Sequence, residues 1–292
     1  MTWHDFAHVL LHSIRDTLII SPFLLLIFVL IAVIEARVDF KKHARLFGGR
    51  LAPFVGSVTG VIPQCGFSVM SVKLYQQRFI TVGTMLAIFV STSDEAVTLL
   101  LSEGLWKEFL ILAVVKMAIG CAVGYLTDFI LRGRDELRWA EGEMPDAEGC
   151  CHHSGKHGKF HVYFVHPLMH CLKTLAYVFA VNLVLGLVVE LVGEENIESF
   201  MTGTGYFQPF VAALIGLIPN CASSVLLVEV FAAGKITFGA LVAGLTANAG
   251  VGLALLFKDN KNLKRNILVV FILYFAGVIF GEIITLISSI IA

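Results

Sequence analysis

The chain has 292 residues, of which 57% are hydrophobic and only 15% are charged, and its net charge is −1. Soluble domains carry about 25% charged residues, so this composition and a mean hydropathy of +0.84 predict an integral membrane protein. The nearly neutral balance argues against a nucleic-acid partner and against a polybasic membrane anchor.

Six apolar runs are long enough to cross a bilayer as helices, which takes about 20 residues. They are Thr17–Ala36, Phe79–Leu101, Phe109–Leu131, Leu172–Val192, Ile236–Phe257 and Asn266–Ala292. No small-residue cleavage pattern follows the first run, so we expect a retained span and not a signal peptide. A polar stretch from Arg132 to His170 separates the first three runs from the last three. We therefore expect an all-α integral membrane protein.

A short motif occurs twice, once on each side of the polar stretch. Gly60-Val61-Ile62-Pro63-Gln64-Cys65 recurs as Gly216-Leu217-Ile218-Pro219-Asn220-Cys221, an offset of 156 positions between Pro63 and Pro219. The same offset aligns Ile80-Thr81 with Ile236-Thr237. We interpret this register as two homologous halves, residues 1–131 and 171–292, joined by a loop at 132–170.

The segments that carry the motif admit two topologies. Each could cross the membrane once with a kink, or enter it, turn at the proline and leave on the same side. Lys and Arg accumulate in cytoplasmic loops. With re-entrant hairpins, all 21 Lys and Arg residues lie inside except Arg15, Lys107 and Lys235, which lie outside, and Lys116, which lies within a span. The kinked alternative places the two basic loops on opposite faces, so we predict re-entrant hairpins.

Each half then has three spanning helices and one re-entrant hairpin, or about ten helical pieces in the whole chain. Because three crossings are an odd number, the halves have opposite orientations, and the sequence predicts two inverted repeats. The hairpins would approach the middle of the membrane from opposite faces.

The hairpin tips are candidates for a substrate site. Proline ends each incoming arm, so the returning arms present free N–H groups and a positive dipole end, which favour an anion. Carbonyl and carboxamide oxygens at the tips suit a cation instead, and the two tip cysteines are soft ligands for thiophilic metals. Alternatively, the prolines are kinks and the cysteines pack as small hydrophobic residues. The candidate substrate- or ion-binding residues are Gln64, Cys65, Ser68, Thr92, Asp94, Glu95, Asn220, Cys221, Ser223, Ser224 and Asn248.

Three ionisable residues within the predicted spans are candidates for ion coupling. Charged groups at membrane depth are expensive and usually mark ion or proton pathways. Asp94 and Glu95 lie six to seven residues before the end of their run, and Lys116 lies near the middle of the next run. We expect Lys116 to pair with one of the two carboxylates, either as a structural ion pair or as a coupling switch.

The polar loop between the halves is rich in potential metal ligands. No spacing in it matches a closed structural zinc site, although Cys/His tracts of this composition can bind metals. A flexible polar linker is the alternative. We expect a cytoplasmic accessory segment whose candidate ligands are Cys150, Cys151, His152, His153 and His157.

The duplicated Pro63-Gln64-Cys65 and Pro219-Asn220-Cys221 motifs, the Ser91–Glu95 segment and the His-rich loop together resemble a known family. This is the ten-transmembrane heavy-metal exporter family, described as bacterial arsenic-efflux or manganese-permease-like proteins. The resemblance covers nearly the whole chain and implies a multi-pass protein of the bacterial inner (plasma) membrane that exports a metal. In architecture alone, the chain also resembles elevator-type carriers with two opposed hairpins, which carry anions with sodium.

Two transport functions follow from these patterns. The first is a secondary-active exporter of a soft or transition-metal ion or a metalloid. The alternative is a sodium- or proton-coupled carrier of a small organic anion. An intramembrane zinc hydrolase is disfavoured, because no histidine lies in a predicted span and no His-Glu-x-x-His motif occurs. We expect no enzyme and no cofactor besides a transported or coupling ion. The expected partners are the lipid bilayer and the substrate, and a homodimer is an open alternative to a monomer.

Overall fold

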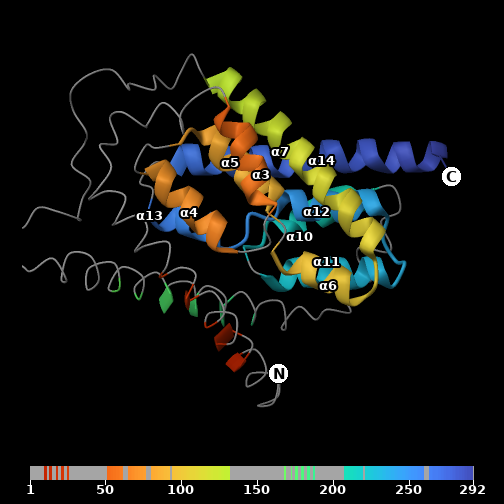
Figure 1. Cartoon of the computed structure of the whole chain (residues 1–292), viewed down its shortest axis with the longest axis horizontal. Coiled ribbons are helices and arrows are strands. Elements are labelled where there is room, and N and C mark those ends of the chain that lie inside the picture. The colour runs from red at the N-terminus through yellow and green to blue at the C-terminus, as the bar shows by residue number, and fades with distance from the viewer. Residues whose placement is uncertain are drawn as a thin grey trace, which may run out of the picture.

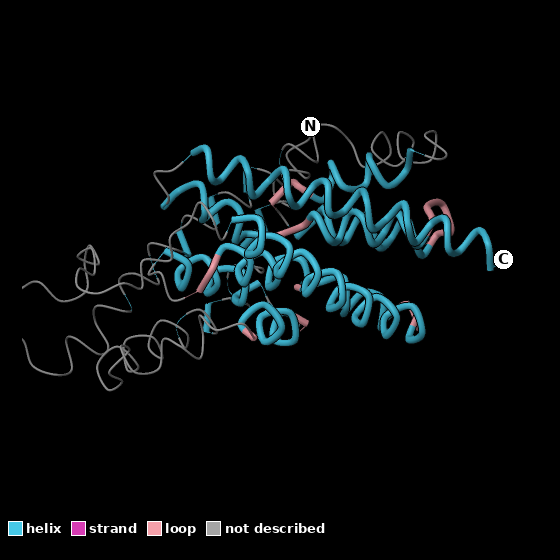
Figure 2. Tube along the Cα trace, turned by 90° about the horizontal axis from the view of Figure 1, so that it is seen from above, coloured by secondary structure: helices cyan, strands magenta, loops and turns pink. Residues whose placement is uncertain are grey.

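The structure, a computed structural model, describes residues 51–61, 65–76, 80–92, 94–131, 207–219, 221–259 and 263–291, with scattered positions at 10–25 and 168–187. In this part of the chain all regular elements are helices and no residue lies in a strand (Figures 1 and 2). The predicted spans Thr17–Ala36 and Leu172–Val192 fall largely outside it. The helices are α3 (Ala52–Gly60), α4 (Cys65–Gln76), α5 (Val82–Ser91), α6 (Asp94–Ser102), α7 (Trp106–Leu131), α10 (Gln208–Gly216), α11 (Cys221–Ala232), α12 (Phe238–Ala247), α13 (Val251–Asp259) and α14 (Leu263–Ile291).

Three helical segments among these residues are long and apolar enough to cross a membrane: Trp106–Leu131, Phe238–Lys258 and Leu263–Ile290. The chain is therefore an α-helical membrane protein, as its composition predicts. The middle segment is 89% buried inside the protein, whereas the other two are 33% buried. A helix that is apolar all round and buried belongs to the centre of a bundle, so α12 lies at the centre while α7 and α14 present wide faces outward.

Two predicted spans are each divided by a break in the middle. We expected Phe79–Leu101 and Ile236–Phe257 to be continuous, but the first forms α5 and α6 and the second forms α12 and α13. Thr92 and Asn248, which end α5 and α12, are extended, with ψ of 130° and 104°. Short polar side chains bond to nearby backbone and so compete with helix continuation. In the second break Gly250 has a φ of +54°, which glycine adopts readily.

Helices α3, α5 and α7 pack through glycines. A methyl group on Gly56 would lie 3.2 Å from the Thr84 carbonyl oxygen, and one on Gly60 would lie 2.9 Å from the Ile88 carbonyl oxygen. Because the later residue of α3 contacts the later residue of α5, the two helices run in the same direction. A methyl group on Gly120 would lie 2.8 Å from the Ala87 carbonyl oxygen. Small residues allow such close backbone approach in membrane proteins, and the contacts hold three helices as one set.

Helices α10, α12 and α14 repeat this arrangement. A methyl group on Gly216 would lie 2.0 Å from the Gly244 carbonyl oxygen, and one on Gly277 would lie 2.5 Å from that of Ala243. Gly60 and Gly216 are 156 positions apart, as are Ile88 and Gly244 on their partner helices. The offset found in the sequence is therefore also present in the helix contacts.

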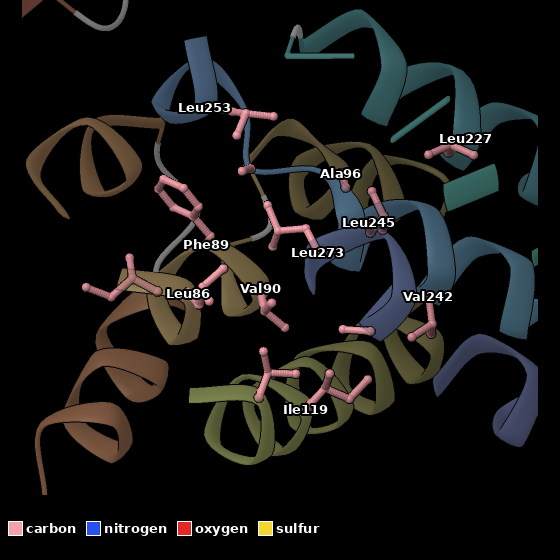
Figure 3. Packing of buried hydrophobic residues seen from close by; sticks show 14 of the residues in the cluster. Leu86, Phe89, Val90, Ala96, Ile119, Leu227, Val242, Leu245, Leu253 and Leu273 are labelled. Carbon is pink, nitrogen blue, oxygen red and sulfur yellow. The ribbon is translucent and has the colours of Figure 1, made fainter. Parts of the chain in front are cut away.

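The two sets interlock through their shorter helices. Helix α13 packs against α4 of the first set, and α6 packs against α11 of the second. Figure 1 shows α13 beside α4 at the left and α6 beside α11 below α12. Figure 3 shows buried side chains of both sets meeting, with Leu273 of α14 close to Ala96 of α6 and Leu245 of α12. One apolar core therefore joins both sets.

The first turns of α5 and α12 are capped by different means. The Thr81 hydroxyl accepts a hydrogen bond from the Thr84 N–H and donates one of 2.7 Å to Asp128, which also accepts from the Gly83 N–H at 2.9 Å. A carboxylate is favourable beside the positive end of a helix. At α12, Thr237 caps the Ala240 N–H, and its own N–H donates to the Gln208 side chain at 3.1 Å.

Replacing Gly216 by alanine should lower the stability of the fold. The added methyl group would collide with the Gly244 carbonyl oxygen, which belongs to the backbone and cannot rotate away. We expect a loss of about 1–3 kcal/mol, as for overpacked cores, although alanine is the better helix former. Thermal unfolding of the purified protein in detergent measures the change. Leu214→Ala, on the exposed face of the same helix, is the control and should unfold near the wild-type temperature. Equal midpoints for Gly216→Ala and wild type would contradict the close packing of α10 and α12.

Candidate functional site

The candidate site is built around the two helix breaks. Thr92 follows α5 and Asn248 follows α12, at positions 156 apart. Both residues are buried. Irregular backbone at membrane depth is tolerated only where it is enclosed by protein or lines a water-filled cavity. Paired breaks of this kind are how discontinuous helices form ion and substrate sites in membrane carriers.

The first break keeps its polar groups bonded within its own helix. The Thr92 N–H and hydroxyl both donate to the Ile88 carbonyl oxygen, at 2.9 and 2.7 Å. The Ser91 hydroxyl donates to the Ala87 carbonyl oxygen at 2.7 Å. These bonds leave the Thr92 carbonyl, which points past the end of the helix, to be satisfied by another part of the chain.

The second break is held by the carboxamide of Asn248. Its Oδ1 accepts from the Gly250 N–H at 2.7 Å, and its Nδ2 lies 3.5 Å from the Ser223 hydroxyl. The Ser223 hydroxyl donates to the Ile218 carbonyl oxygen at 3.2 Å. Ile218 is two residues beyond the end of α10. The structure therefore brings two predicted site residues, Ser223 and Asn248, together next to Pro219. Ser224, also predicted, is buried on the same helix.

Two buried hydroxyls near the breaks have no hydrogen-bond partner among the described residues: those of Ser68 and Thr246. Ser68, which is fully buried, lies against α13, because a methyl group on Gly252 would be 2.8 Å from its Cβ. Thr246 lies in the last turn of α12, two residues before Asn248. An unsatisfied buried hydroxyl costs about 1–3 kcal/mol, so these are positions where a water or a bound substrate would be stabilised.

Lys116 lies between the two breaks. Its side chain is fully buried, and its Nζ donates to the carbonyl oxygens of Thr92, at 2.5 Å, and of Leu245, at 2.8 Å. One amine from α7 therefore bonds to the ends of both α5 and α12. We expected Asp94 or Glu95 as its partner; their side chains lie outside the described residues, and that pairing stays a prediction.

Several predicted residues begin the helices that follow the turns and breaks. Cys65 is the first residue of α4, Cys221 is the first of α11, and Asp94 is the first of α6. The free N–H groups and the positive dipole end of each helix are located there. The predicted arm ends are close to those observed, since α3 ends at Gly60 and α10 at Gly216.

The remaining predicted residues lie outside the described part of the chain. This applies to Gln64, Asn220 and the loop residues Cys150, Cys151, His152, His153 and His157, and to the side chains of Cys65, Cys221, Asp94 and Glu95. Within the described part, no group of three or more His, Cys, Asp or Glu residues is placed to hold a metal ion. The roles predicted for these residues stay predictions.

Sequence reasoning missed two carboxylates in the spans, Asp128 of α7, which caps α5, and Glu282. Glu282 lies inside α14, and its Oε1 is buried with no hydrogen-bond partner among the described residues. The signal was present, because a carboxylate within an apolar run marks a functional position by default. The breaks were also signalled, by the polar run Ser91-Thr92-Ser93 and by Asn248-Ala249-Gly250.

The fold defines an α-helical membrane protein with two matched helix breaks. A family model described as "Putative, 10TM heavy-metal exporter" matches residues 5–172 and 168–290. The chain belongs to this family, as the duplicated proline motifs indicated. No curated protein and no solved structure is similar enough to the chain to be matched.

Replacing Asn248 by alanine should destabilise the second break. The substitution leaves the buried Gly250 N–H without its acceptor, a loss of about 1–3 kcal/mol. Ser223→Ala is the comparison, because it keeps the acceptor for Gly250 and removes the 3.5 Å contact with the same carboxamide together with the 3.2 Å bond to the Ile218 carbonyl oxygen. Thermal unfolding should rank the variants as wild type, then Ser223→Ala, then Asn248→Ala. An equal loss in both variants would show that the acceptor for Gly250 is not what holds the break.

Proposed function

We propose that this protein is a secondary-active exporter that moves a soft or transition-metal ion, or a metalloid, out of the bacterial cytoplasm across the inner membrane. The observation that carries the proposal is the pair of matched helix breaks in a chain of the heavy-metal exporter family. Each break exposes the negative end of one short helix and the positive end of the next. Such sites can be presented in turn to the two sides of a membrane.

The proposed architecture is two inverted repeats, 1–131 and 171–292, each with one re-entrant hairpin. Since α3 and α5 run in the same direction, α4 must return the chain to the side from which α3 entered. Such a path supports the proposed re-entrant hairpin. The contacts of α6 with α11 and of α13 with α4 support opposite orientations, because each helix beyond a break extends into the other set.

The proposed substrate site lies between the tips and the breaks. Cys65 and Cys221 would supply thiolates, which suit soft metals and metalloids. The unpartnered hydroxyl of Ser68 and the contact between Ser223 and Asn248 support further oxygen ligands there. Gln64, Asn220, Ser224 and Thr92 complete the proposed set.

The proposed coupling groups are Asp94 and Glu95, which begin α6 directly after the first break. There they would bind a proton or a cation whose movement drives export. Lys116 is the third proposed coupling residue. The Cys150–His157 segment would capture metal on the cytoplasmic side as an accessory to the transport site.

Replacing either tip cysteine should lower metal transport. We expect inside-out vesicles that contain the wild-type protein to accumulate arsenite or a transition metal. Cys65→Ser and Cys221→Ser should each lower uptake by about tenfold or more, since the loss of ~1.4 kcal/mol of binding free energy corresponds to a factor of ten.

Cys121→Ser is the control for this experiment, because Cys121 lies in α7 with its Sγ 2.8 Å from the Ser57 hydroxyl, a contact that serine can also form. Its uptake should match that of wild type. If vesicles accumulate no metal or metalloid but take up an organic anion in a sodium-dependent manner, the protein is instead the organic-anion carrier, and the cysteines are packing residues.

Replacing the carboxylates of α6 by amides should stop transport without unfolding the protein. Asp94→Asn and Glu95→Gln keep the size of each side chain and remove the charge that would bind the coupling ion. We expect at least one of them to lower vesicle uptake to the background level. Glu103→Gln, in the exposed turn after α6, should transport normally. Wild-type uptake in both variants would exclude these carboxylates from coupling.

A further inference from the structure

The amine of Lys116 occupies a position that would suit a small monovalent cation. It donates to two backbone carbonyl oxygens, those of Thr92 and Leu245, at 2.5 and 2.8 Å. They come from parts of the chain that are 153 positions apart, and Lys116 itself is fully buried. Carbonyl oxygens at the C-terminal ends of broken helices are the ligands that membrane carriers offer to monovalent cations.

Both carbonyls need such a donor. In a continuous helix the Leu245 carbonyl would accept from the Ala249 N–H, and the Thr92 carbonyl would accept from the Ala96 N–H, four residues later. The breaks interrupt both bonds, and among the described residues the donor to each carbonyl is Lys116. A helix C-terminus carries the equivalent of about −0.5 elementary charge, so two such ends favour an ammonium group between them.

The second set has no lysine at the matching place. Gly277 packs on the Ala243 carbonyl as Gly120 packs on that of Ala87, and this correspondence aligns Lys116 with Leu273, which is fully buried. Figure 3 shows Leu273 close to Leu245, and both belong to the same buried cluster. A single amine therefore serves both broken helices.

We propose that Lys116 is a tethered cation: its ammonium group fills a carbonyl-lined site between the ends of α5 and α12 that would otherwise bind a free monovalent cation. The wild-type protein then needs no sodium or potassium ion at this place. Removal of the side chain would leave a cavity with two carbonyl oxygens and two negative helix ends, which ammonium, methylammonium or an alkali cation could enter.

The experiment measures thermal unfolding of purified full-length protein in detergent, in N-methylglucamine chloride and in ammonium, methylammonium, sodium or potassium chloride of equal ionic strength. Lys116→Ala should unfold several degrees below wild type in N-methylglucamine, and at least one small cation should raise its midpoint saturably, as ligand binding to the folded state does. Wild type and Lys107→Ala, an exposed lysine of the same helix, should show no such rise.

Lys116→Met is the second variant, because methionine fills the cavity without a charge. It should be destabilised and should not respond to small cations. The proposal is overturned if Lys116→Met is as stable as wild type, or if Lys116→Ala responds to the salts only as wild type does. Since no readout involves transport, this result is independent of whether the protein exports metal.

A paired variant tests the proposal if Lys116→Ala yields no folded protein. Lys116→Leu with Leu273→Lys moves the amine to the matching place on α14, where the equivalent carbonyls are those of Asn248 and Phe89. We expect this double variant to be clearly more stable than Lys116→Leu alone. A double variant that is no more stable than the single one would overturn the proposal.

Discussion

Within a bilayer every backbone N–H and carbonyl must find its partner inside the protein, and this constraint is hardest to meet at the breaks after Thr92 and Asn248. Local bonds satisfy part of each break, through the Thr92 hydroxyl and the Asn248 carboxamide. The carbonyls of Thr92 and Leu245, whose helical hydrogen bonds the breaks interrupt, need a donor from another part of the chain, and Lys116 provides it. A charged residue in a span, usually a liability, here satisfies groups that the breaks would otherwise leave unpaired.

The same constraint explains why glycine is concentrated where it is. Lys116 can reach both breaks only if α7 lies close to α5 and α5 close to α12. Gly120 and Gly124 bring α7 onto α5, and in the second set Gly277 and Gly281 bring α14 onto α12. Lipid supplies no hydrophobic force between helices, so close backbone contact must provide the packing energy. The glycines therefore pack the neighbouring helices closely around α5 and α12, and this close packing allows both helices to end within the membrane.

Much of this fold follows from local sequence signals, but the bonds from Lys116 to the carbonyls of Thr92 and Leu245 do not. Proline restricts the residue before it, which is why the arm ends at Gly60 and Gly216 could be predicted within about two residues. The two breaks escaped prediction because Phe79–Leu101 and Ile236–Phe257 are apolar enough to be read as continuous spans. Thr92 and Asn248 were interpreted from the sequence only as candidate ligands. The carbonyls of Thr92 and Leu245 that accept from Lys116 are backbone groups, one of them 129 positions away, and side-chain identity carries no signal for a backbone acceptor.

The asymmetry between the two sets bears on how such a protein could move. In the proposed inverted repeats, the two halves would exchange conformations between the inward-facing and outward-facing states. Lys116 has no equivalent in the second set, because Leu273 occupies the matching place, so one amine must hold both broken helices in every state or release one of them. If it holds both, α5, α7 and α12 move as a single body and the shorter helices α4, α6, α11 and α13 move around it. If it releases one, a helix end is left with an unpaired carbonyl, and that state is stable only when another cation or water reaches the same oxygen.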